Sequence, residues 1–228
     1  PKTRMIVINS PHNPTGAVMT KSEMDQVSSI AEKNDLYLVS DEIYARMIYE
    51  DANTTFYSPS IRDRCKDFTI VINGFSKSYA MTGWRLGVVM GPADLISKMG
   101  LLLETTTSCV SPFLQDAGVE ALTGSQNAIE KMMNKFRLRR DLIYDGLNSL
   151  PGITCVKPKG AFYAFPNIAD TGYTSEEISK LFLENANVAV APGTIFGDCG
   201  ESYIRLCFAN SEKNINSAIV RMEKALKA

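Results

Sequence analysis

Residues 36–42 read Leu-Tyr-Leu-Val-Ser-Asp-Glu, a short apolar run that ends directly in polar residues. Such a run is typical of a strand buried in a parallel sheet. Residues 5–8, Met-Ile-Val-Ile, form a similar run, and we expect this strand to be buried on both faces. Between the two runs, Thr20 and Glu23 form a capping-box pattern that begins a helix reaching about Asn34. Strand, helix and strand in this order predict a βαβ unit and a fold of the α/β class.

Two further apolar runs, at residues 69–72 and 86–90, extend the predicted sheet. We therefore assign residues 1–125 to an α/β domain with a mostly parallel sheet. A strand buried on both faces needs neighbouring strands and covering helices, and little sequence precedes the first run. We expect this chain to be the C-terminal part of a longer one.

The pattern changes after residue 125. Apolar residues at helical spacing predict a long helix over about 126–150, ended by Pro151 and Gly152. The other elements predicted here are four short strands, at residues 153–157, 161–165, 188–191 and 203–208, and two helices, at residues 174–187 and 211–226. We assign residues 126–228 to a small α+β domain whose first helix joins it to the preceding domain.

Composition and charge exclude several functional classes. Of the 228 residues, 45% are hydrophobic and 21% are charged, which is typical of a globular protein with a real core. A net charge of −1 gives no overall field that would attract nucleic acid or an anionic membrane, and no apolar run reaches the ~20 residues that span a bilayer. The five cysteines show no CxxC spacing and there is one histidine, so we expect reduced thiols, no metal site and a cytoplasmic location.

Polar residues of complementary chemistry follow the predicted strands. In an open α/β sheet, ligands bind outside the carboxyl ends of the strands. Asn13 follows the first strand, Asp41 the second and Lys77 the third, while Arg85 directly precedes the fourth. A carboxylate, a lysine and an arginine at one edge suit a cofactor with a cationic ring nitrogen, an aldehyde and a phosphate. Pyridoxal 5'-phosphate (PLP) is such a cofactor, and we predict that it binds here.

Five segments, taken in order, resemble the signature segments of the class I/II aminotransferases, in the aspartate and aromatic aminotransferase branch. They are Ser-Pro-His-Asn-Pro-Thr-Gly at 10–16, Ser-Asp-Glu-Ile-Tyr at 40–44, Ser-Lys at 76–77, Met-Thr-Gly-Trp-Arg-Leu-Gly at 81–87 and Ile-Arg-Leu-Cys-Phe-Ala at 204–209. One segment alone would be weak support, whereas all five in order make coincidence very improbable. The resemblance implies part of the large domain of a fold-type I PLP-dependent transferase, followed by its small C-terminal domain.

The resemblance also implies roles in binding the cofactor. Lys77 would bond covalently to the aldehyde of PLP and would then move a proton at the substrate α-carbon. Asp41 would hold the protonated ring nitrogen, while Tyr44 and Asn13 would hydrogen-bond the phenolic oxygen. Plainer interpretations remain open for each of them: a surface lysine, a helix-capping aspartate, a core tyrosine and an asparagine in a turn before proline.

Three further residues are implied in anion binding. Ser76 and Arg85 would bind the cofactor phosphate, and Arg205, together with Asn13, would bind the substrate carboxylate. Either arginine could instead pair with a carboxylate of the protein itself. Many relatives place a hydroxyl three residues before the lysine, where this chain has Gly74, so that contact is lost or supplied by backbone.

The reaction implied by the resemblance is the transfer of an amino group from an amino acid to a 2-oxo acid, in ping-pong fashion between PLP and pyridoxamine phosphate. Aspartate-like or aromatic amino acids are the expected substrates, and a homodimer is the expected assembly. Two alternatives stay open: a PLP-dependent lyase of the same fold, and an aminotransferase-like effector domain of a transcription regulator. The sequence also leaves open whether this part of a chain binds PLP or is active alone.

Overall fold

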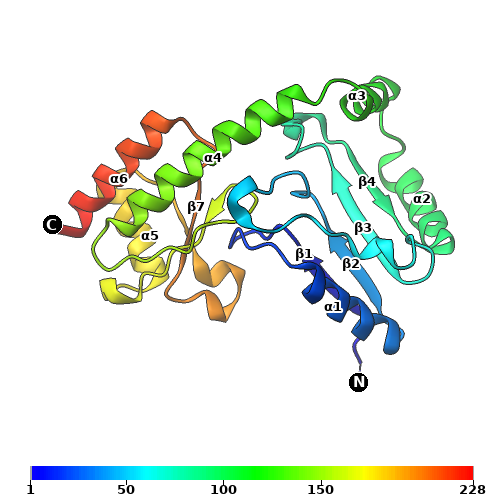
Figure 1. Ribbon diagram of the computed structural model, residues 1–228, viewed down its shortest axis with the longest axis horizontal. Coiled ribbons are helices and arrows are strands. Elements are labelled where there is room, and N and C mark those ends of the chain that lie inside the picture. The colour runs from blue at the N-terminus through cyan, green and yellow to red at the C-terminus, as the bar shows by residue number, and fades with distance from the viewer. Residues whose placement is uncertain (1, 228) are drawn as a thin grey trace. The chain divides into compact units, whose positions relative to one another are not determined.

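The computed structural model describes residues 2–227 and divides the chain into two compact units. Unit 1 comprises the residues up to Pro11 together with Val18–Glu130, and unit 2 comprises His12–Ala17 together with the chain from Lys131 onward. The break between Glu130 and Lys131 lies inside helix α4 (Asn127–Asn148), which is labelled in Figure 1. The domain boundary predicted between residues 125 and 126 stays a prediction. Within residues 2–227, no helix combines the length and the apolar character needed to cross a membrane.

The predicted α/β class is confirmed by a four-stranded sheet in unit 1. Its strands are β1 (Met5–Asn9), β2 (Tyr37–Asp41), β3 (Thr69–Gly74) and β4 (Gly87–Met90), in that order across the sheet (Figure 1). β1, β2 and β3 run parallel, and β4 pairs antiparallel with β3. The helix predicted between the first two strands is α1 (Lys21–Lys33), and it begins with the predicted capping box.

The expectation that the first strand is buried on both faces is wrong for β1. Met5 is 48% exposed and Val7 is 65% exposed. β1 lies at the edge of the sheet and pairs only with β2 among the described strands, so its side chains lack neighbours on one side. The central strand β2 behaves as predicted, because Leu38 and Val39 are both buried.

Two helices of unit 1 were not predicted: α2 (Ala93–Thr107) and α3 (Pro112–Thr123). None of the residues of α2 is buried. Its apolar residues include the consecutive Leu101, Leu102 and Leu103, each at least 50% exposed. Leu95, Met99 and Leu102 recur at helical spacing, so the sequence carried a periodic signal for α2 that sequence reasoning did not use.

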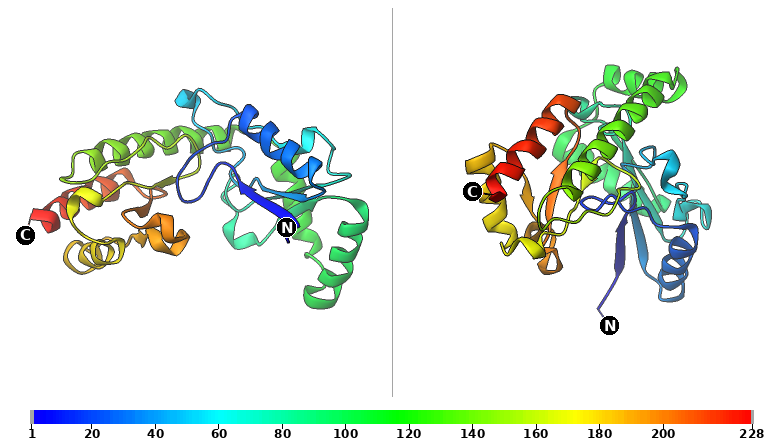
Figure 2. Two further views of the ribbon diagram at one scale, coloured as in Figure 1. Left: turned by 90° about the horizontal axis from the view of Figure 1, so that it is seen from below. Right: turned by 60° about the vertical axis from the view of Figure 1, so that its left-hand side comes forward.

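Unit 2 has a small antiparallel sheet covered by helices. The strands are β5 (Tyr163–Ala164), β6 (Ala191–Pro192) and β7 (Ile204–Cys207), with β7 in the centre. Helices α5 (Ser175–Ala186) and α6 (Glu212–Lys227) pack against each other (Figure 2), and α4 contributes buried residues such as Phe136 and Leu147. Short 3₁₀ turns in the two units lie at Glu50–Ala52, Pro59–Ile61, Thr82–Trp84, Ala169–Thr171, Gly193–Phe196 and Asp198–Gly200.

The strand predicted at residues 153–157 is wrong. This segment has a single bridge, between Thr154 and Asn167. The Asn148 side chain explains the difference, because its Oδ1 accepts from the Cys155 N–H over 2.9 Å and its Nδ2 donates to the Cys155 carbonyl over 3.2 Å. A side-chain amide therefore satisfies backbone groups that a strand partner would otherwise bind. The strand predicted at 188–191 is also shorter than expected, since β6 begins only at Ala191.

The loop His12–Ala17 belongs to unit 2 although it is distant from the rest of that unit in sequence. The Gly16 carbonyl accepts from the N–H groups of Lys159 and Gly160, each over 2.9 Å. Gly16 has φ +68°, and a Cβ there would lie 2.7 Å from Cβ of Pro158. Both the backbone conformation and the close approach therefore require glycine at this position.

Candidate active site

Strand directions in unit 1 bring three of the predicted site residues to one edge of the sheet. β2 and β3 are parallel, so their carboxyl ends, followed by Asp41 and Lys77, lie at the same edge. β4 is antiparallel and pairs its first residue, Gly87, with Gly74 at the end of β3. Arg85, two residues before Gly87, therefore reaches this edge as well.

Asp41 is half-buried and organises the turn that follows β2. Its Oδ1 accepts from the backbone N–H of Ile43 over 3.1 Å, and its carbonyl accepts from Asn9 Nδ2 over 3.1 Å. One carboxylate oxygen of Asp41 therefore does cap the following backbone, which is the plainer interpretation that the sequence left open. Among residues 2–227 the structure records no hydrogen-bond donor for Oδ2, which leaves this oxygen available to a ligand.

Lys77 and Ser76 are half-buried in a tight turn after β3. The carbonyl of Phe75 accepts from the N–H groups of Tyr79 and Met81, over 3.3 and 3.2 Å. At Gly74, a Cβ would lie 3.2 Å from the Leu86 carbonyl oxygen, closer than most real Cβ contacts. Packing therefore accounts for glycine where many relatives carry a hydroxyl.

Arg85 and Tyr44 differ in their surroundings. The Arg85 guanidinium is exposed, donates through Nη1 to the Thr82 carbonyl over 3.0 Å, and forms no ion pair among residues 2–227. The described chain therefore offers Arg85 no ion pair with a surface carboxylate, which was the alternative interpretation of this residue. Tyr44 is only 4% exposed, so it packs as a core aromatic, and its role toward a cofactor stays a prediction.

The remaining two predicted residues, Asn13 and Arg205, meet in unit 2. Arg205 Nη1 donates to Asn13 Oδ1 over 3.1 Å, and the Asn13–Pro14 bond is cis. The guanidinium lies 4.8 Å from the ring centroid of Tyr163 and 5.0 Å from that of Phe196. Its Nε is buried and has no acceptor. No carboxylate of residues 2–227 pairs with it, so the alternative of a structural ion pair is absent there too.

Comparison with known proteins now decides the family. The sequence profile described as "Aminotransferase class I and II" matches residues 1–222. The chain belongs to the class I and II aminotransferase family. It is 42% identical over its full length to aromatic-amino-acid aminotransferase 2 of Thermococcus litoralis, and 45% identical over 99% of its length to an aspartate aminotransferase of Pyrococcus horikoshii. It spans 58% and 57% of the length of these two relatives.

Solved structures of the family agree in fold. An aromatic aminotransferase from Pyrococcus horikoshii superposes with a TM-score of 0.94 at 42% identity, covering 99% of this chain and 60% of that one. The aspartate aminotransferase of Thermus thermophilus with maleate gives 0.90 at 36% identity, covering 98% of this chain and 57% of that one. The resemblance and the fold expected from the five segments are therefore confirmed.

Sequence reasoning missed the two aromatic residues that flank Arg205 in this aminotransferase-family chain. Tyr163 was expected only as part of a strand, and no role was predicted for Phe196, which lies in the 3₁₀ turn Gly193–Phe196. The ring contacts themselves depend on the fold, because Tyr163 comes from β5 and Phe196 from the turn that follows β6.

Glu42 is a second residue that sequence reasoning missed. It follows Asp41, is only 5% exposed, and accepts from the hydroxyls of Ser58 over 2.6 Å and Ser40 over 3.1 Å. Burial raises the pKa of the Glu42 carboxyl, and the two serine hydroxyls offset only part of this effect. The residue therefore holds the turn after β2 at the expense of burying a carboxyl group.

Glu42→Gln should make stability less dependent on pH. The unfolded carboxyl titrates near 4.5, and the folded pKa is higher, so the stability due to protonated Glu42 is complete below 4.5 and is lost as the pH rises through the folded pKa. The variant lacks this loss, so its thermal midpoint should lie above that of the wild type at neutral pH and equal it in acid. The exposed Glu104→Gln is the control. Parallel wild-type and Glu42→Gln midpoints at every pH would contradict the prediction.

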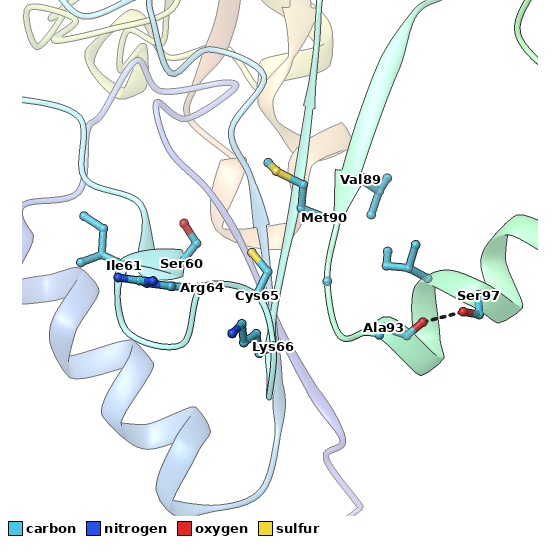
Figure 3. A pocket seen from close by; sticks show the side chains of 11 residues that line it. Ser60, Ile61, Arg64, Cys65, Lys66, Val89, Met90, Ala93 and Ser97 are labelled. Atoms are coloured by element: carbon cyan, nitrogen blue, oxygen red, sulfur yellow. Dashed lines mark hydrogen bonds between the residues drawn. The ribbon is translucent and has the colours of Figure 1, made fainter.

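A groove of about 1210 Å³ lies at the other end of the sheet in unit 1. Figure 3 shows Ser60, Arg64 and Cys65 on one side of it and Ala93 and Ser97 of α2 on the other. Burial and nearby carboxylates raise the pKa of the Cys65 thiol, which disfavours the reactive thiolate. The groove shares no residue with the candidate site, and we assign it no role.

Proposed function

We propose that the protein containing this chain is an aminotransferase that moves an amino group from an amino acid to a 2-oxo acid with PLP as cofactor. The observation that carries the proposal is the state of Arg205, which has a buried Nε without an acceptor and no carboxylate partner among residues 2–227. A half-buried guanidinium fixed by an amide and two aromatic rings is well suited to bind a carboxylate. Amino acids and 2-oxo acids both carry one.

The residues at the sheet edge of unit 1 fit PLP by their chemistry. Asp41 leaves one carboxylate oxygen for a ring N–H, Lys77 offers an amine for the aldehyde, and the exposed Arg85 guanidinium offers donors to a phosphate. Bound PLP would supply the electron sink for negative charge that develops at the substrate α-carbon. Ser76 would add a hydroxyl donor to the phosphate.

The chain's own residues then have separate tasks. Asp41 holds a proton on the ring nitrogen through an ion pair, and Tyr44 and Asn13 donate to the phenolic oxygen. The Lys77 amine would act as the general base that takes the proton from the substrate α-carbon and then, as a general acid, would deliver it to C4′ of the cofactor. Arg205, together with Asn13, would hold the substrate carboxylate and so restrict the orientation of the bound substrate.

Product analysis of the full-length protein tests the proposal. Incubation with an aspartate-like or aromatic amino acid and 2-oxoglutarate should give glutamate and the 2-oxo acid of the donor. These donors are chosen because the relatives carry the names aspartate and aromatic-amino-acid aminotransferase. An elimination product would instead identify a lyase, and the absence of both reactions with every donor would overturn the proposal.

We also propose a cytoplasmic homodimer. All five cysteines, which lie in the described part of the chain, are free thiols, and reduced thiols are typical of a cytoplasmic protein. Cyclic dimers are the commonest closed assembly of soluble enzymes. Sedimentation of the active full-length protein should give the mass of two subunits, and the mass of one subunit would contradict the dimer.

The two arginines should fail in different ways when each is replaced by lysine, which lacks the planar fork. Arg205→Lys should keep PLP bound but raise KM for both the amino acid and the 2-oxo acid. The loss of one charge-assisted bond, about 1.5–3 kcal/mol, lowers kcat/KM by roughly tenfold or more. Arg85→Lys should instead lose PLP on dialysis. The absorbance of the bound cofactor measures this loss. An Arg205→Lys protein that lost PLP but kept its KM values would contradict the assignment.

A further inference from the structure

A cluster of three side chains in unit 1, here called the Arg46 clamp, joins segments that are distant in sequence. Arg46 Nη1 donates to Tyr79 Oη over 2.6 Å and also donates to Gln126 Oε1. The Arg46 guanidinium lies 5.4 Å from the centroid of the Tyr79 ring, within the range of a cation–π contact. One guanidinium thus makes three directed contacts at the surface of the unit.

Both partners of Arg46 are held in place independently of it. Gln126 Nε2 donates to the carbonyls of Ala121 and Gly124, over 3.1 and 2.7 Å, which aims its Oε1 in a fixed direction. The Tyr79 ring lies 5.3 Å from the ring of Phe75, which is itself only 4% exposed. Arg46 therefore bridges two fixed points rather than two mobile side chains.

The place of the clamp in the fold suggests its purpose. Arg46 lies in the turn after β2, five residues beyond Asp41, and Tyr79 lies in the turn after β3, two residues beyond Lys77. β2 and β3 are parallel neighbours, so these two turns leave the sheet side by side. A movement of one turn relative to the other would change the separation between the carboxylate of Asp41 and the amine of Lys77.

We propose that Arg46 is a positioning residue that fixes the Lys77 turn relative to the Asp41 turn through Tyr79. The proposal rests on the function proposed above, in which one cofactor must reach both Asp41 and Lys77. A displacement of about 1 Å at a reacting group can cost roughly 10²-fold in rate, so a tie between the two turns has a direct catalytic value. The contacts of Arg46 are with Tyr79 and Gln126, so in this proposal it acts on the cofactor only through the Lys77 turn.

A matched arginine separates this role from a general effect on stability. Arg62 is also an exposed arginine of unit 1, and it ties its turn to α1 through Ser29 Oγ over 3.0 Å and Glu32 Oε2 over 2.6 Å. Its contacts resemble those of Arg46 in number and exposure, but they do not involve the turns that carry Asp41 and Lys77. Arg62→Ala is therefore the control for Arg46→Ala.

The experiment measures the reactivity of Lys77 in the full-length protein without cofactor. An amine-acylating reagent is added at fixed pH, and peptide mass spectrometry gives the rate for Lys77 relative to the exposed Lys98. Arg46→Ala should raise this ratio by roughly three- to tenfold, because the turn carrying the half-buried Lys77 moves more freely without a charge-assisted bond. Arg62→Ala should leave the ratio unchanged.

A conservative variant protects the test against misfolding. Tyr79→Phe keeps the ring against Phe75 and removes only the hydroxyl that Arg46 binds, so it should raise the ratio in the same direction. Because both changes remove the same bond, the double variant should match Arg46→Ala rather than the product of the two effects. Tyr57→Phe, which loses a hydroxyl bond to Asp25, is the control for the tyrosine.

In the loaded enzyme, Arg46→Ala and Tyr79→Phe should lower kcat and PLP retention while leaving KM for the amino acid unchanged. An unchanged Lys77 ratio in Tyr79→Phe, or an equal response of Arg46→Ala and Arg62→Ala, would overturn the proposal. If the ratio responds as expected but the wild-type protein binds no PLP, the proposed function is wrong. The inference that Arg46 fixes the Lys77 turn relative to the Asp41 turn would still hold.

Discussion

Lys77→Ala should abolish transamination in the full-length protein. The change removes the amine that moves the proton at the substrate α-carbon, and this acid–base role alone is worth about 10²–10⁴-fold in rate. Loss of covalent attachment should lower the rate further and weaken PLP retention. Initial rates of 2-oxo acid formation measure the effect. The exposed Lys98→Ala, in helix α2 of the same unit, should keep the wild-type rate.

Chemical labelling checks the same assignment without a variant. Borohydride reduction of the PLP-loaded wild-type protein should fix the pyridoxyl group on one lysine, which peptide mapping identifies. We expect the label on Lys77. A label on any other lysine would sink the assignment even if Lys77→Ala were inactive, because inactivity could then follow from a distorted turn after β3.

Asp41→Asn should keep PLP bound and still lower the rate by roughly 10²–10⁴-fold. The estimate follows from breaking one partly buried ion pair, about 3–5 kcal/mol, between the carboxylate and a protonated ring nitrogen. The amide keeps an oxygen for the Ile43 N–H, which Asp41 Oδ1 now accepts, so the turn after β2 should survive. The same rate assay is used, with the exposed Asp67→Asn as control. Near-normal turnover of Asp41→Asn would show that Asp41 serves only the turn.

The elements that could be predicted from sequence are those whose signal is local. The capping boxes at Thr20 and Thr174 begin α1 and α5 as expected, because both partners of each box lie within four residues. The long helix α4 follows its apolar spacing. Predictions were wrong where a contact outside the apolar pattern decided the structure, as at Cys155, where the Asn148 side-chain amide replaces a strand partner.

The candidate site likewise has features that could be predicted from sequence and features that depend on the folded structure. That Asp41, Lys77 and Arg85 share an edge follows from strand ends and directions, which the order of apolar runs already indicates. The surroundings of Arg205 did not follow from sequence, because its aromatic neighbours Tyr163 and Phe196 meet it only once the small sheet has formed. Its likeness to the family motif singled out Arg205 as a candidate, and the structure added the contacts that hold its side chain.

The loop His12–Ala17 makes unit 2 discontinuous in sequence, with a consequence for dissecting the protein into pieces. The hydrogen bond between Asn13 and Arg205 joins residues 192 positions apart, so chain entropy opposes its closure until much of the intervening chain is ordered. A fragment starting at Lys131 would lack both Asn13 and Gly16. Arg205 Nη1 and the N–H groups of Lys159 and Gly160 would then lose their acceptors, and an isolated C-terminal fragment would be a poor surrogate for the proposed carboxylate site around Arg205.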